Sequence, residues 1–127
     1  VLSQLKKEHN GFRIPHIVFT KGGGIWLDEI ADSGCDVVGL DWTMNLGKAR
    51  ARVGDRVALQ GNLDPLVLLT DPATVAREAA AIVRAAGSAP GHIFNLGHGI
   101  VPGTPPENVA ALVEAVHATS RETRAAA

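Results

Sequence analysis

The sequence has 127 residues, of which 46% are hydrophobic and 20% are charged, and its formal net charge at pH 7 is −1. Globular domains cluster at about 100–150 residues, so we expect one domain over residues 1–127, whereas a closed barrel of eight βα units needs about 250 residues. The balanced charge, the 4% aromatic content and the absence of Tyr argue against the basic, stacking surfaces that bind nucleic acids.

The cysteine content and the apolar runs indicate a reducing, cytoplasmic compartment. Cys35 is the single cysteine, so it forms no disulfide within the chain and no Cys pair has the spacing of a zinc site. No apolar run approaches the ~18–20 residues of a membrane span, and residues 1–7 lack the pattern of a signal peptide. Because Val1 precedes a pattern typical of the last turns of a helix, we expect the natural start to lie upstream.

The first half of the chain predicts two strand–helix units. The apolar run Ile14–Thr20 predicts a strand, and Ile25–Ala31 predicts the helix that follows it. A second strand is predicted at Asp36–Leu40, followed by a short helix through Lys48–Arg52 that ends at Gly54.

The second half repeats the same order twice. A strand is predicted at Arg56–Gln60, before a long helix whose N-cap is Asp71 and which stops at Gly87. A fourth strand is predicted at His92–Leu96 and a final helix at about Pro105–Arg124.

The spacing of these units predicts a parallel sheet covered by helices. The last helix should bury one face, formed by Val109, Leu112, Val113 and Val116. Strands recur about every 26 residues, close to the ~30 residues of a βαβ unit. The chain therefore holds about four βα units, which form half of a barrel or a small open sheet.

Two kinds of loop residue follow the predicted strands, where parallel βα folds place their chemistry. The glycine-rich loop that begins at Lys21, Gly22 and Gly23 is either a tight turn or an anion-facing loop with free N–H groups. Asp41 and Asp64 are either acid–base groups or helix caps and loop ligands, and the structural interpretation is favoured for both.

His98 is the strongest candidate for a functional side chain. It stands between two glycines just past the fourth strand, so its ring can project into the cleft at the mouth. An imidazole there can donate a hydrogen bond to a carboxylate or move a proton. Trp42 either walls an aromatic ligand or packs at its strand end, and Cys35 lies at the opposite end of the sheet as a small apolar residue.

Three motifs together resemble the uroporphyrinogen decarboxylase family. They are Val38–Trp42, Leu59–Pro65 and Asn95–Ile100, in the order and at the spacing of the C-terminal part of that family. The resemblance implies the C-terminal half of a (β/α)8 TIM barrel, usually a homodimer, without metal or organic cofactor. It implies an enzyme that removes carbon dioxide from the four acetate side chains of uroporphyrinogen to give coproporphyrinogen.

The resemblance also implies roles for single residues. His98 matches the family histidine that lies in the substrate cleft and binds carboxylates or assists proton transfer. Asp41, Gln60, Asn62 and Asp64 match motif positions whose roles stay open, and Asn95 of the third motif is a further candidate near the cleft. The family's paired arginines, its aspartate and its tyrosine belong to preceding segments, so we expect this chain to be inactive alone.

Two other interpretations remain. One is a zinc-dependent corrinoid or thiol methyltransferase of the same superfamily, although its His-x-Cys pair is replaced here by His16 and Val18. The other is a non-catalytic half-barrel that associates with itself, because a slice of a barrel has two open edges and an apolar inner face.

Overall fold

The computed structural model describes the whole chain, from Val1 to Ala127. Its central element is a four-stranded parallel sheet in which the strands are neighbours in chain order. The strands are β3 (Ile17–Phe19), β4 (Val37–Gly39), β5 (Ala58–Gln60) and β6 (His92–Ile93). Consecutive parallel strands joined by crossover segments are the repeating unit of a βα barrel, so the predicted fold class is confirmed.

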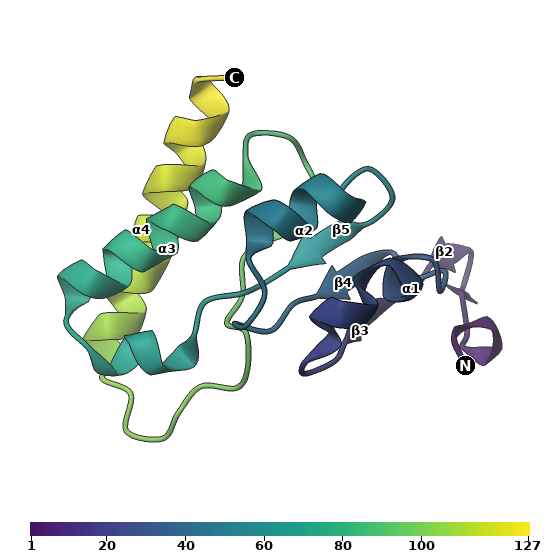
Figure 1. Cartoon of the computed structure of the whole chain (residues 1–127), viewed down its shortest axis with the longest axis horizontal. Coiled ribbons are helices and arrows are strands. Elements are labelled where there is room, and N and C mark those ends of the chain that lie inside the picture. Colours follow the sequence, from purple (N-terminus) through teal and green to yellow (C-terminus); the bar gives the residue numbers. More distant parts are fainter.

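A helical segment follows each strand of this sheet (Figure 1). Their bounds are η2 (Gly23–Trp26) with α1 (Leu27–Ala31), α2 (Leu46–Val53), η3 (Pro65–Leu69) with α3 (Pro72–Ala86), and finally α4 (Pro106–Ala125). The two long helices, α3 and α4, pack side by side. None of the helices has the length and apolarity that a membrane span requires.

The hydrophobic core lies between the helices and one face of the sheet. Val38 and Leu59 project from β4 and β5 into a cluster with Leu27 of α1 and with Ala49 and Val53 of α2, and all five are at most 1% exposed. A second cluster joins the loop after β5 to η3, α3 and α4. Burial of this face fixes which side of each strand the helices cover.

The opposite face of the sheet has no helix on it. Ile17 and Phe19 of β3 and Ile93 of β6 belong to this face, because alternate residues of a strand point to opposite sides and the register aligns Phe19 with Gly39 and Gly39 with Gln60. Their exposed fractions are 49%, 45% and 45%. A sheet with helices on one face and exposed apolar residues on the other is the arrangement of a barrel wall, whose inner face lines the lumen.

The strands are shorter than the apolar runs that predicted them. Ladder pairing of β3 with β4, for example, covers Ile17–Phe19 only, and Pro15, which cannot donate to a ladder, lies before it. The predicted fourth strand ends at Ile93, although Leu96 pairs again with Leu63 in an isolated bridge.

The predicted ends of α3 are confirmed. The Asp71 side chain accepts a hydrogen bond from Thr74 N, and Gly87 ends the helix with φ of 77°. In α4, Leu112 is buried but Val113 is 47% exposed, so the predicted burial of Val113 is wrong. Val113 lies beside Phe94 and Leu96 near the free edge of β6, where no further element of this chain covers it.

The predicted helical start is also wrong. Only Leu2–Gln4 form a 3-10 turn (η1), and the antiparallel strands β1 (Glu8–His9) and β2 (Phe12–Arg13) follow it. Asn10 and Gly11, with φ of 50° and 80°, form the hairpin turn, because Asn-Gly is the strongest two-residue signal for such a turn.

Truncation of Leu59 should test the one-sided core. We expect Leu59→Ala to lower the free energy of unfolding of the protein by about 2–5 kcal/mol, since it leaves a cavity between β5 and α2. The matched control is Leu66→Ala, because Leu66 is 57% exposed and its truncation should change stability by less than about 0.5 kcal/mol. Urea unfolding measures both values, and equal effects would contradict the core described above.

Candidate active site

Asp41 is the buried polar centre of the loops that follow the strands. It comes two residues after β4 and is 3% exposed. Its carboxylate accepts hydrogen bonds from Gly22 N in the loop after β3, from Thr43 N at 2.9 Å and from Thr43 Oγ1 at 2.5 Å. A carboxylate that receives several N–H and O–H donors is held as an anion and ties its loops together.

The environment of Asp41 lowers the pKa of its carboxyl from the ordinary value of 3.8. Burial alone would raise this pKa, but the hydrogen bonds from Thr43 and Gly22, together with the positive charge of Lys21, outweigh it. Asp41 is therefore ionised at neutral pH and has its acceptor oxygens occupied by the protein. The favoured structural interpretation of Asp41 agrees with this geometry.

Two further polar residues at the mouth also support loops. Asn62, 5% exposed, donates through Nδ2 to Asp41 O at 2.8 Å and to Met44 O at 2.5 Å, which joins the loop after β5 to the loop after β4. Asp64 accepts a hydrogen bond from Leu66 N at 2.9 Å and caps η3. The Asn62 amide and the Asp64 carboxylate thus bind the backbone of the loops rather than face a cleft.

His98 lies in the loop after β6 and is exposed. Gly97 before it is buried against the loop after β4, where a Cβ on Gly97 would fall 2.3 Å from Trp42 N. Only glycine permits this approach of two backbones. The missing side chain at Gly97 therefore sets His98 beside Trp42.

Aromatic rings surround His98. Its ring centroid lies 5.8 Å from that of Trp42 with an interplanar angle of 88°, and 6.4 Å from that of Phe19 with an angle of 65°. Lys21 Nζ lies 5.3 Å from the Trp42 ring centroid, which is the geometry of a cation–π contact. Sequence position puts each of these residues in or just past a strand but does not indicate that their side chains meet.

A cleft of about 580 Å³ opens at this mouth. Its lining includes His98, Phe19 and Gln60, together with Asn95, whose Oδ1 accepts from Leu96 N at 2.9 Å. Of the predicted residues, His98, Asn95 and Gln60 line the cleft. The others do not line it, namely Lys21, Gly22, Gly23, Asp41, Asn62 and Asp64. Lys21 lies next to the cleft through its contact with Trp42.

The glycine-rich loop after β3 forms a turn. Gly22 has φ of 72°, and Gly23 N donates to Thr20 O at 3.2 Å. Because Gly22 N donates to Asp41, two of the N–H groups that an anion would need are already used within the chain. The backbone of this loop thus supports the tight-turn interpretation and leaves the Lys21 side chain as its exposed cation.

The residues of this mouth do not form a metal-binding set. No three His, Cys, Asp or Glu side chains of the chain cluster closely enough to hold a metal ion. Cys35, 8% exposed, lies before β4, and its Sγ donates to Ile30 O at 3.3 Å. Cys35 is thus a buried packing residue at the end of the sheet away from His98, as predicted.

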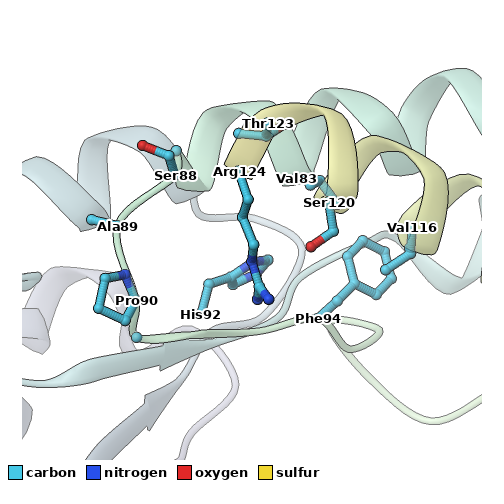
Figure 2. Close-up of a pocket in the computed structure, with 12 residues that line it drawn as sticks. Val83, Ser88, Ala89, Pro90, His92, Phe94, Val116, Ser120, Thr123 and Arg124 are labelled. Atoms are coloured by element: carbon cyan, nitrogen blue, oxygen red, sulfur yellow. The ribbon is translucent and has the colours of Figure 1, made fainter. Parts of the chain in front are cut away.

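A second cavity, of about 210 Å³, lies at the opposite end of the sheet (Figure 2). It is bounded by the loop before β6 and by the last turns of α4, and it contains none of the predicted site residues. His92 in this cavity contacts Gly61 O through Nε2 at 2.9 Å, and burial lowers the pKa of its imidazole from 6.5. Chemistry in βα folds gathers at the other end, so this cavity is not the candidate active site.

Comparisons with known proteins agree with the motifs at the mouth. The family model described as uroporphyrinogen decarboxylase (URO-D) matches residues 1–119. The chain belongs to the uroporphyrinogen decarboxylase family. A relative named uroporphyrinogen decarboxylase from Methylibium petroleiphilum is 65% identical over all of this chain, and one from Paraburkholderia phytofirmans is 61% identical. The chain spans 35% of the length of each of these curated relatives.

A solved structure shares the fold. A methyltransferase from Methanosarcina mazei superposes with a TM-score of 0.70 and 25% sequence identity, over 80% of this chain and 30% of that one. The decarboxylase relatives are far more similar in sequence. A zinc-dependent methyltransferase needs a set of metal ligands, and this chain contains no such cluster.

Replacement of Asp41 should test its role as an anionic loop ligand. Because the folded-state pKa is lowered, the carboxylate stabilises the fold above about pH 4, and this contribution is lost as pH falls through the folded pKa. We expect Asp41→Asn to cost about 1–3 kcal/mol at pH 7 and progressively less toward pH 3.

Asp64→Asn is the matched control for this experiment. Asn caps a helix about as well as Asp, so stability should change little at either pH. Urea unfolding across this pH range measures both variants. A cost for Asp41→Asn that stays constant down to pH 3 would contradict the anionic role.

Proposed function

We propose that this chain is the C-terminal part of a uroporphyrinogen decarboxylase, a carboxy-lyase that converts the four acetate side chains of uroporphyrinogen to methyl groups. The match of the family model across residues 1–119 carries this proposal. The cleft at the carboxyl ends of the strands, lined by His98 and Asn95, supports it, because this is where βα folds bind their substrates.

The proposed reaction needs a proton donor and groups that stabilise the positive charge of the protonated ring. Protonation of the pyrrole ring allows it to accept the electron pair of the breaking carbon–carbon bond, and carbon dioxide leaves. The methylene carbon then takes up a proton to become a methyl group, and the ring carbon that was protonated first releases its proton, which restores the neutral pyrrole. The protein supplies proton transfer, stabilisation of the cationic ring and binding of the remaining carboxylates.

His98 is the residue of this chain that we assign to the substrate. Its exposed imidazole lines the cleft, where it binds a substrate carboxylate or transfers a proton. Asn95 lines the same cleft. Gly22, Gly23, Asp41, Asn62 and Asp64 shape the loops around it through the hydrogen bonds and turn described above.

The rest of the substrate site belongs, in this proposal, to the preceding part of the full-length enzyme. Arg52 of α2 and Arg56 in the turn after α2 form ion pairs with Asp28 of α1. Arg50 donates to backbone carbonyls before β6. A substrate with many carboxylates requires guanidinium groups at the mouth. We further propose a cytoplasmic, homodimeric enzyme that needs no metal or organic cofactor, in line with the family resemblance.

Replacement of His98 tests the site assignment. In the full-length enzyme we expect His98→Ala to lower kcat/KM for uroporphyrinogen by at least about tenfold, since a charge-assisted hydrogen bond or a proton transfer is lost. The melting temperature should stay unchanged because His98 is exposed. His117→Ala, at an exposed position of α4, is the control and should retain full activity. Unchanged kinetics in His98→Ala would remove the assignment.

The isolated chain should be inactive. We expect no coproporphyrinogen from the purified 127-residue chain, because the groups that bind most of the substrate's carboxylates are absent from its mouth. Chromatographic detection of the product, with full-length enzyme as the positive control, measures this. Sustained production by material free of full-length enzyme would show that this chain holds a complete site.

A further inference from the structure

Lys21 and His98 share one aromatic side chain. Lys21 Nζ lies 5.3 Å from the Trp42 ring centroid, and the His98 ring centroid lies 5.8 Å from it. The three residues belong to the loops after β3, β4 and β6, so they are far apart in the sequence. A single indole therefore holds two hydrogen-bond donors at the edge of the cleft.

Trp42 is the fixed member of this group. It is half-buried, and it follows Asp41, whose carboxylate is held by Gly22 and Thr43. Its backbone nitrogen lies against Gly97, where a Cβ would come within 2.3 Å. Hydrogen bonds and backbone packing thus place the indole, whereas Lys21 and His98 are exposed beside it.

The ammonium of Lys21 is free to take an anionic partner. The ion pairs of the chain use Arg13, Arg52, Arg56 and Arg77, and Lys21 enters none of them. The nearby carboxylate of Asp41 is occupied by Gly22 and Thr43. A cation on an aromatic face is oriented by the ring and still offers its N–H groups on the open side.

We propose that Trp42 is a positioning residue that holds Lys21 and His98 as a pair for one carboxylate of the substrate. This inference rests on the proposed function, because it assumes a carboxylate-bearing substrate in the cleft. Beside one indole, an ammonium N–H and an imidazole N–H can each donate to one oxygen of the same carboxylate. Trp42 itself does not react. It determines the positions of the Lys21 ammonium and the His98 imidazole.

The test uses the full-length enzyme with Trp42→Leu, Trp42→Phe and Lys21→Met. We expect Trp42→Leu and Lys21→Met each to raise KM by roughly three- to thirtyfold with a smaller change in kcat, because a binding contact is lost. Trp42→Phe should retain most of the affinity, since it keeps a ring face. Trp26→Leu, at a 59% exposed indole outside the group, should leave KM unchanged.

A double variant separates positioning from mere packing. If Trp42 acts through Lys21, Trp42→Leu should raise KM less in the Lys21→Met background than in the wild type. Strictly additive effects, or an unchanged KM in Trp42→Leu, would overturn the proposal. Should Trp42→Leu fail to fold, Lys21→Arg and Lys21→Met decide, because the proposal requires Arg to retain KM and Met to raise it.

The His98→Ala variant separates a failure of this inference from a failure of the earlier proposal. Reduced kcat/KM in His98→Ala, together with a normal KM in Lys21→Met and Trp42→Leu, would overturn this inference and leave the proposed function standing. Normal kinetics in all of these variants would overturn this inference and the assignment of His98, whereas a full-length protein that forms no coproporphyrinogen would overturn the proposed function.

Discussion

The backbone and carboxylate at Asp41 and Trp42 connect all four loops at the carboxyl edge of the sheet. Gly22 donates to the Asp41 carboxylate from the first loop, and Asn62 donates to the Asp41 carbonyl from the third. Gly97 of the fourth loop packs on Trp42 N, where any larger residue would collide. Without this connection the strands would still pair, but His98 would have no fixed place at the cleft.

The packing of helices on only one face of the sheet also determines where the cleft lies. The helices bury one face, and the exposed Ile17, Phe19 and Ile93 belong to the other. A barrel places those residues in its lumen and its substrate at the mouth above them. The cleft lined by Phe19 and His98 lies at that mouth, so the exposed face of the sheet continues into the candidate site.

Local signals predicted much of this molecule, and tertiary contacts account for the remainder. Both ends of α3 follow from the sequence, because Asp71 is a favoured N-cap residue and Gly87 readily adopts the positive φ that ends the helix. The pattern at the start of the chain predicts the last turns of a helix, whereas the Asn10–Gly11 dipeptide carries the local signal of the hairpin turn that the structure contains. His98 was predictable from its motif, whereas its contact with Trp42 depends on two loops that only the folded sheet brings together.

A crystal structure of the full-length protein with a bound coproporphyrinogen-type tetrapyrrole would show whether the ligand lies in this cleft. We expect a carboxylate of the ligand within hydrogen-bond distance of a His98 ring nitrogen, in the cleft at the carboxyl ends of β3, β4, β5 and β6. A tetrapyrrole bound elsewhere, with His98 facing only solvent, would contradict this expectation.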